Sequence, residues 1–292
     1  MNTTSTLQAL LDGGDLLTIP TCFDALSARI VHEAGFPATF MSGFGVAAAR
    51  LGMPDTGLIS FAEMVDQLRN ICGAVPGLPV IADADTGFGN AMNVRRTVAE
   101  YARAGAACIM IEDQVAPKRC GHFDGKEVIS REEARIKIRA AVQAGREAGI
   151  LILARTDARA VLGFEAAMQR CRDFEDEGAD IVFLEAPQSE DELRAFVQGS
   201  RKPTMANMVA GGKTPLLSSE VLKKHGVRVA VHHPLLFTAV RAMQDAAAAL
   251  RSDHSAGAPP AASFAEVKRL VGVPEYEALE RGYAIRSQEN AE

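Results

Sequence analysis

The chain has 292 residues, a net charge of −6, 48% hydrophobic residues and 23% charged residues. The acidic balance excludes a basic surface for nucleic acid or for an anionic membrane, and no apolar run reaches the roughly 18 residues that cross a bilayer. The N-terminus lacks the basic start and apolar core of a signal peptide. Five irregularly spaced cysteines argue against a disulfide framework, so a reduced, cytoplasmic protein is expected.

Short apolar, β-branched runs alternate with longer segments of helical periodicity. The eight predicted strands are 17–20, 38–41, 79–82, 107–111, 151–154, 181–184, 204–206 and 227–231. The clearest predicted helices are 91–104, 131–148 and 164–177, and the last of the series spans about 235–250. Alternating strands and helices indicate a parallel sheet. Eight such units predict an α/β fold of the (β/α)8, TIM-barrel type, for which about 250 residues suffice.

Nearly every predicted strand runs into polar residues. In chain order these are Thr21, Asp24, Ser42, Asp83, Asp85, Glu112, Arg155, Glu185, Asn207, His232 and His233. A doubly wound sheet would collect its site at one crevice, whereas a barrel builds a site from many strand ends at its C-terminal rim. The series therefore favours a barrel enzyme with its site at that rim.

Four acidic residues form the candidate metal site: Asp55, Asp83, Asp85 and Glu112. Oxygen ligands of this kind suit Mg²⁺ or Mn²⁺. The alternative is that the acids pair with Lys118 and Arg155 in an ion-pair network. Metal binding is the favoured interpretation, because several carboxylates at adjacent strand ends otherwise repel one another.

Cys120 stands between Arg119 and Gly121 in a segment that we expect to be mobile. Neighbouring cations favour its thiolate, so it is a candidate nucleophile or general acid/base, and the residues alone do not separate these roles. The glycines after Ser42 are candidates for an anion nest. Arg155 could bind a carboxylate bidentately or pair with Glu185, and Asn207 could donate to a carboxylate or only end its strand.

The chain is expected to divide into a catalytic barrel at 1–251, a Gly-, Pro-, Ser- and Ala-rich linker at 252–262 and a helical tail at 263–292. Ser263 is the predicted N-cap of the first tail helix, with Glu266 completing a capping box. A helix pair beyond a finished barrel has no core of its own, so packing on a neighbouring subunit is expected.

Six stretches together resemble the isocitrate lyase/phosphoenolpyruvate mutase superfamily. They are Ser-Gly-Phe-Gly at 42–45, Gly-Met-Pro-Asp at 52–55, Asp-Ala-Asp-Thr-Gly-Phe-Gly at 83–89, Ile-Glu-Asp-Gln at 111–114, Lys-Arg-Cys-Gly-His at 118–122 and Ala-Arg-Thr-Asp at 154–157. The resemblance covers essentially the whole chain. The 118–122 stretch is similar to that of the carbon–carbon lyase branch, which contains the methylisocitrate and 2,3-dimethylmalate lyases and petal death protein. The resemblance implies a (β/α)8 barrel, Mg²⁺ dependence and a homotetramer whose C-terminal helices are swapped between paired subunits.

The resemblance also implies roles by position. Asp83 and Asp85 would hold Mg²⁺, with Asp55 and Glu112 acting largely through its waters. Cys120 would be the general acid, counted with Arg155 and Glu112 as the catalytic set. The implied substrate-binding residues are Ser42, Gly43, Phe44, Gly121, His122, Arg155, Glu185 and Asn207. The implied reaction is a retro-aldol-type cleavage of a 2-hydroxy dicarboxylate to an α-keto acid and a carboxylate.

Three departures from the methylisocitrate lyase pattern narrow the implied substrate. Phe40 replaces a tyrosine, Arg241 lies about two residues too late for the third carboxylate, and the tail position carries Phe264. An alkyl-substituted malate such as 2,3-dimethylmalate is therefore favoured. The alternatives are methylisocitrate cleavage, oxaloacetate hydrolysis or decarboxylation (disfavoured by Pro234) and a phosphoenolpyruvate or carboxyphosphonoenolpyruvate phosphonomutase activity. A binding protein that has lost catalysis is the remaining alternative. The residues leave the alkyl groups, the stereochemistry and the general base open.

Overall fold

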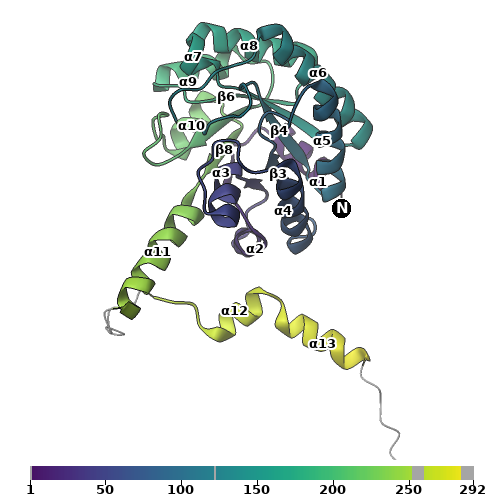
Figure 1. Ribbon diagram of the computed structural model, residues 1–292, viewed down its shortest axis with the longest axis vertical. Helices are drawn as coiled ribbons and strands as arrows, with labels where there is room; N and C mark the ends of the chain where they lie inside the picture. The colour runs from purple at the N-terminus through teal and green to yellow at the C-terminus, as the bar shows by residue number, and fades with distance from the viewer. Residues whose placement is uncertain (1, 122, 252–259, 284–292) are drawn as a thin grey trace, which may run out of the picture. The chain divides into compact units, whose positions relative to one another are not determined.

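The computed structural model describes residues 2–121, 123–251 and 260–283. The chain divides into two compact units, Met1–Thr238 and Ala239–Glu292. In the first unit, eight parallel strands close into a barrel in chain order, surrounded by helices (Figure 1). The (β/α)8 prediction is therefore confirmed.

The strands carry the bounds β1 Leu17–Cys22, β2 Thr39–Met41, β3 Val80–Asp83, β4 Cys108–Glu112, β5 Leu151–Thr156, β6 Ile181–Leu184, β7 Thr204–Met208 and β8 Val229–His232. The helices of the first half are α1 Thr3–Asp12, α2 Ala25–Glu33, α3 Gly43–Val46, the π-helix η1 Ala47–Leu51, α4 Phe61–Ala74 and α5 Ala91–Ala104. Those that follow are α6 Arg131–Ala148, α7 Ala158–Leu162, α8 Phe164–Glu177, α9 Glu190–Gly199, α10 Ser219–His225 and α11 Pro234–Arg251.

The helices predicted at 91–104, 131–148 and 164–177 match α5, α6 and α8. Each ends at a glycine in the left-handed conformation, which only glycine adopts without strain. β6 has its predicted bounds, and the other strands differ from expectation by one or two residues at their ends. Val227 belongs to the turn that ends α10, its N–H donating to the Leu222 carbonyl, so β8 begins later than predicted. β7 continues past 206, so Asn207 pairs with Val231 inside the sheet rather than beyond it.

Alternate strand residues divide the core into two clusters, because successive side chains of a strand face opposite sides of the sheet. One cluster fills the barrel interior with residues such as Ile81, Leu153 and Phe183, and α1 adds Leu7 and Leu11 to it. The other lies between the strands and the surrounding helices. The apolar interior supports the strand ends from below, so their polar side chains meet at the rim.

The second unit holds the end of α11 and the helices α12 Phe264–Leu270 and α13 Val273–Tyr283. The predicted capping box is confirmed: Ser263 and Glu266 satisfy each other's backbone N–H groups at the start of α12. Most of the predicted linker (252–259) and the end of the tail (284–292) lie outside the described residues. Over the part of the chain that is described, no helix is both long and apolar enough to span a bilayer.

Candidate active site

A cavity of about 230 Å³ opens among the C-terminal ends of the strands. Nine of the predicted site residues line it: Ser42, Phe44, Asp55, Asp83, Cys120, Gly121, Arg155, Glu185 and Asn207. Gly43, Asp85 and Glu112 lie behind its wall and contact these residues, as described below. His122, also predicted, lies outside the described residues.

Asp83 is the last residue of β3 and is held by backbone donors. Its Oδ2 accepts a hydrogen bond from the Gly43 N–H at 3.2 Å, and its Oδ1 accepts one from the Asp85 N–H at 3.0 Å. A Cβ at residue 43 would lie 2.7 Å from Asp83 Oδ2, so this approach of α3 to β3 requires glycine. Asp85 has φ of 48°, a left-handed conformation that is strained for a side-chain-bearing residue. The strained turn therefore directs the carboxylates of Asp83 and Asp85 to the same region.

Lys118 joins the acids in this structure. Its Nζ lies 2.5 Å from Asp55 Oδ1 and 2.9 Å from Asp85 Oδ1, and all three side chains are buried. Burial raises the pKa of Asp85 to about 6, although Lys118 opposes this shift. The ion-pair alternative to a metal site is thus the arrangement the structure holds. Among the described residues, no three His, Cys, Asp or Glu side chains converge closely enough to hold a metal ion.

The chemistry of the donor set nevertheless fits a hard cation. Asp55 Oδ1 and Asp85 Oδ1 make ion pairs with Lys118 but no properly directed hydrogen bond, and Glu112 Oε1 has no partner among the described residues. Burial raises the pKa of Glu112 well above its ordinary value, with Arg155 opposing. A buried carboxylate oxygen without a partner is costly and often marks the place of an ion.

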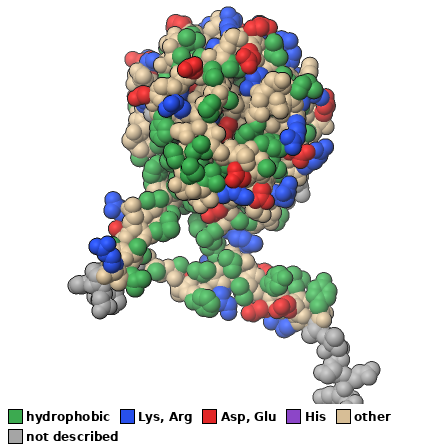
Figure 2. Space-filling view, in the orientation of Figure 1, with side chains coloured by type: hydrophobic (Ala, Val, Ile, Leu, Met, Phe, Trp, Pro, Cys, Tyr) green, Lys and Arg blue, Asp and Glu red, His purple; other side chains and the backbone are tan. Residues whose placement is uncertain are grey.

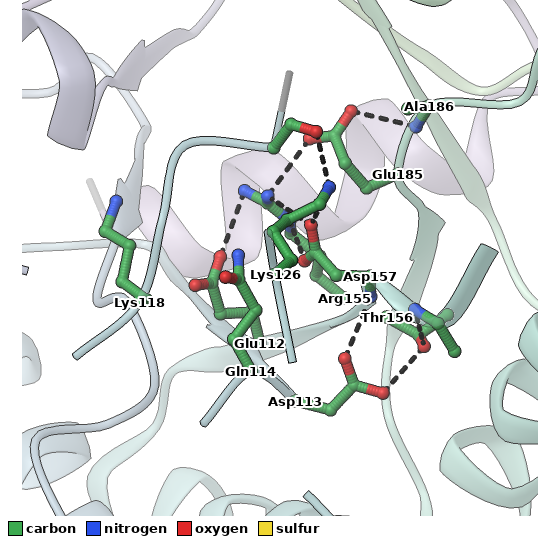
Figure 3. Close-up of polar contacts among 12 residues, drawn as sticks. Glu112, Asp113, Gln114, Lys118, Lys126, Arg155, Thr156, Asp157, Glu185 and Ala186 are labelled. Carbon is green, nitrogen blue, oxygen red and sulfur yellow. Dashed lines mark hydrogen bonds and ion pairs between the residues drawn. The ribbon is translucent and has the colours of Figure 1, made fainter. Parts of the chain in front are cut away.

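Arg155, on β5, is the centre of the buried charges (Figure 3). Its guanidinium contacts Glu112 at 3.1 Å, Glu185 at 3.3 Å and Asp157 at 2.8 Å. It also lies over the Phe183 ring, 5.6 Å from the ring centre. Arg155 forms the predicted ion pair with Glu185, and its guanidinium still lines the cavity. The ion pair is therefore compatible with the binding of a substrate carboxylate by Arg155.

The segment after β2 is a short helix rather than an open glycine loop. Ser42 is the N-cap of α3, and its Oγ accepts a hydrogen bond from the Gly45 N–H at 3.1 Å. The Gly43 N–H is already directed to Asp83. The binding of a substrate carboxylate by Ser42, Gly43 and Phe44 stays a prediction.

Cys120 is the one cysteine among the residues that line the cavity, and its N–H donates to the Asp55 carbonyl at 3.0 Å. All five cysteines are described and none forms a disulfide. Burial raises the pKa of Cys22 and Cys72 to about 12, and raises that of Cys108 and Cys171 well above the ordinary value. Those four thiols stay protonated and pack with the hydrophobic cores as small apolar side chains.

Two polar residues of the site, Asp157 and Lys126, were not singled out from the sequence, and His233 was named as a strand-end residue without a role. His233 lines the cavity, and its Nε2 lies 2.6 Å from Asn207 Oδ1. Asp157 and Lys126 are buried and bonded to each other beneath the Cys120 segment. Asp157 stood in the Ala-Arg-Thr-Asp stretch, which was a usable signal, but nothing local distinguished Lys126 from a surface lysine.

The remaining wall is apolar. It is formed by Phe40, Phe44, Met110, Phe123, Phe183, Met205, Val209, Ala210, Val231 and Phe237. Phe44 and Phe237 stack with their ring centres 6.5 Å apart. Among the described residues that line the cavity, Arg155 is the only lysine or arginine.

Residues 7–251 match the family model described as Phosphoenolpyruvate phosphomutase. A 2,3-dimethylmalate lyase of Eubacterium barkeri is 41% identical over 97% of this chain and 99% of its own length. The structure of an oxaloacetate acetylhydrolase with 3,3-difluorooxalacetate superposes with a TM-score of 0.93 and 35% identity, covering 98% of each chain. A phosphonopyruvate hydrolase, solved with oxalate and Mg²⁺, has a TM-score of 0.85 and 31% identity, covering 97% of this chain and 99% of its own.

Proposed function

The chain belongs to the phosphoenolpyruvate phosphomutase family, in its carbon–carbon lyase branch, and we propose that it cleaves an alkyl-substituted malate such as 2,3-dimethylmalate. The products are an α-keto acid and a carboxylate. The similarity to the Eubacterium barkeri lyase over nearly the full length of both chains supports this choice.

The observation that carries the proposal is the division of the cavity into a charged end and an apolar wall. A dicarboxylate needs positive charge at the charged end, which Arg155 supplies together with a cation at the acidic cluster. Among the described lining residues there is no second lysine or arginine for a third carboxylate, so its charge would be buried without a cationic partner. Methyl groups gain from the same wall, at about 0.8 kcal/mol for each buried carbon.

Asp83 and Asp85 are the residues proposed to hold Mg²⁺ (Mn²⁺ being possible), with Asp55 and Glu112 nearby. When bound, the ion would polarise the substrate oxygen that becomes the carbonyl of the keto acid. Lys118 pairs with Asp55 and Asp85, so the ion would compete with its ammonium for these two carboxylates. The loop that carries Lys118 also carries Cys120, so metal binding and the position of the acid are linked through two residues of chain.

The residues of the chain then act as follows. Arg155 holds one substrate carboxylate and is itself oriented by Asp157 and Glu185. A general base takes up the hydroxyl proton of the substrate, the C2–C3 bond breaks, and the electron pair of that bond passes to the departing carboxylate, which leaves as an enolate. Cys120 donates its proton to that enolate carbon, and the segment around it covers the cavity against water.

The first experiment is a coupled assay for released α-keto acid, with Mg²⁺ and with EDTA. The panel contains 2,3-dimethylmalate, other 2- and 3-alkylmalates, methylisocitrate, isocitrate, oxaloacetate and phosphonopyruvate. We expect metal-dependent release from an alkylmalate, with kcat/KM higher than for methylisocitrate. The absence of turnover with every hydroxy dicarboxylate contradicts the proposal. Turnover of phosphonopyruvate would instead indicate P–C bond chemistry.

Oxaloacetate hydrolysis is the second candidate, because an oxaloacetate acetylhydrolase structure superposes on the chain with a TM-score of 0.93. The same panel separates the two. An acetylhydrolase forms oxalate and acetate from oxaloacetate, whereas the lyase forms a keto acid from an alkylmalate. Oxalate production without keto-acid release favours this second candidate.

We propose further that α12 and α13 pack on a second copy of the chain, in a homotetramer of helix-swapped dimers. Neither helix has a buried residue, and Phe264, Tyr276, Leu279 and Tyr283 expose 81%, 69%, 60% and 85% of their area. Figure 2 shows apolar side chains along this segment. Exposed apolar surface of this extent is typical of an interface.

Light scattering on the full chain tests this assembly. We expect a tetramer mass for the parent chain and for Glu280→Gln, an exposed polar control, and a smaller species for the double variant Phe264→Asp/Leu279→Asp. A monomer mass for the parent chain contradicts the proposal.

A further inference from the structure

Lys126 is a buried lysine that the reaction above does not use. Its side chain is 1% exposed, and its Nζ donates to Asp157 Oδ1 at 2.8 Å and to the Gly121 carbonyl. An ammonium group is rarely buried, because its desolvation costs several kcal/mol unless partners compensate it. Its two partners join the barrel, through β5, to the segment that carries Cys120 (Figure 3).

The segment that carries Cys120 runs between Gln114 and Val128. It is held at its two ends, which pair with each other, and again at Gly121. At the two ends, Gln114 and Val128 form an antiparallel bridge, and the Val115 N–H donates to the Glu127 carbonyl. Arg170 ties the returning strand to the barrel by donating to the Ile129 carbonyl and to Asp113. Between these points, the Gln114 side chain exchanges two hydrogen bonds with the Arg119 backbone, and Lys118 pairs with Asp55 and Asp85. Lys126 adds a bond that crosses from the returning side to Gly121.

Gly121 lies directly on the buried charges. A Cβ there would come within 2.5 Å of Glu185 Oε2 and 2.6 Å of Arg155 Nη2. The Gly121 carbonyl accepts from Lys126, and the neighbouring Cys120 N–H donates to the Asp55 carbonyl. The peptide group before Cys120 is therefore held by the Asp55 carbonyl, and the carbonyl one residue after Cys120 is held by Lys126.

Asp157 serves both sides of this arrangement. Arg155 donates to it through Nε at 2.8 Å and Nη2 at 3.0 Å, beside the Lys126 bond to the same carboxylate. Burial would raise the pKa of Asp157, but Arg155 and Lys126 hold it below its ordinary value. The Asp157 carboxylate thus orients Arg155 and also holds the Lys126 ammonium, which donates to the Gly121 carbonyl.

We propose that Lys126 is a positioning residue, which holds the Cys120 segment over the cavity by linking the Gly121 carbonyl to Asp157. Lys126 positions Cys120, the proposed general acid, without touching substrate. Because Lys126 and Arg155 both bond Asp157, the positions of Cys120 and Arg155 depend on the same carboxylate. The catalytic consequence rests on the proposed function, whereas the bracing of the segment does not.

The test uses the full chain in two arms, and the first needs no substrate or metal. In Lys126→Met, we expect maleimide labelling of Cys120 and trypsin cleavage after the exposed Arg119, both localised by mass spectrometry, to accelerate at least about tenfold, because a hydrogen bond to a charged group is lost. The matched control is Lys213→Met, since Lys213 bonds the same segment at Asp124 through an exposed pair. Its rates should stay within about twofold of the parent.

Lys126→Met leaves Asp157 with less positive charge, so it can lose stability. The double variant Lys126→Met/Asp157→Asn removes both charges and should keep the fast labelling while regaining melting temperature. Parent-like labelling and cleavage in both folded variants overturns the bracing role.

In the second arm, kcat of Lys126→Met should fall at least about tenfold with KM changed less than kcat, because Cys120 rather than Arg155 is displaced. Fast labelling with unchanged kcat overturns the positioning role, and fast labelling in a chain that turns over no substrate on the panel refutes the proposed function alone.

Discussion

Cys120→Ser should lower kcat on the alkylmalate substrate by about 10²- to 10⁴-fold, the usual contribution of a positioned general acid. A serine hydroxyl has nearly the same size but is far less acidic than a thiol, so it fills the position without delivering the proton. Cys120 lines the cavity and is not part of the buried cores. The melting temperature should therefore stay close to that of the parent chain.

Cys72→Ser is the matched control, because Cys72 is the other cysteine that is not fully buried. Burial raises its pKa to about 12, and it lies in α4, away from the cavity residues. Its kcat should stay within about twofold of the parent value. Steady-state kinetics with Mg²⁺ in excess is the measurement, and full activity in Cys120→Ser would falsify the assignment of the acid.

Arg155→Met should both destabilise the protein and abolish substrate binding. Its guanidinium lies between Glu112, Asp157 and Glu185, and removing one partner from a buried ion cluster costs about 3–5 kcal/mol. Urea unfolding measures this loss. Arg139→Met is the control: its partner Glu177 is also held by Arg135 and the pair is half-exposed, so a cost of about 0–1 kcal/mol is expected.

The pH dependence of Arg155→Met has a defined sign. Burial already raises the pKa of Glu112, with Arg155 opposing, so the variant raises that pKa further. A carboxyl group with a raised pKa binds protons more tightly when folded than when unfolded, so its destabilising effect grows as pH rises above the unfolded pKa and fades below it. The deficit relative to the parent should shrink as pH is lowered from about 8 to about 5.

Arg155→Lys separates binding from stability. It keeps a positive charge among the carboxylates but loses the planar fork that holds a substrate carboxylate bidentately. We expect KM to rise at least about tenfold while most of the urea midpoint is retained. Unchanged KM in Arg155→Lys would mean that Arg155 is only a structural partner of Asp157 and Glu185.

Local sequence patterns were enough to predict the barrel and the end of the barrel that carries the site. Hydrophobic runs of strand length alternate with helical segments, and local propensity and capping decide both, as at α5, α6 and α8. Polar residues stand at or just beyond the strand ends, where buried backbone gives way to the rim. Asp83 and Glu112, each the last residue of its strand, could be placed in the site for this reason.

Which charged side chains contact one another depends on long-range folding and could not be predicted from local patterns. Lys118 reaches Asp55 and Asp85, and Lys126 reaches Asp157, through contacts between residues far apart in the chain. Lys118 could be named from the sequence as a possible partner of the acids, but not which acids it contacts. No local pattern distinguishes Lys126 from a solvated lysine, because its burial depends on how the β4–α6 segment folds back over the neighbouring strands. The register of β7 with β8 likewise brings His233 to Asn207, a contact that depends on the pairing of two strands.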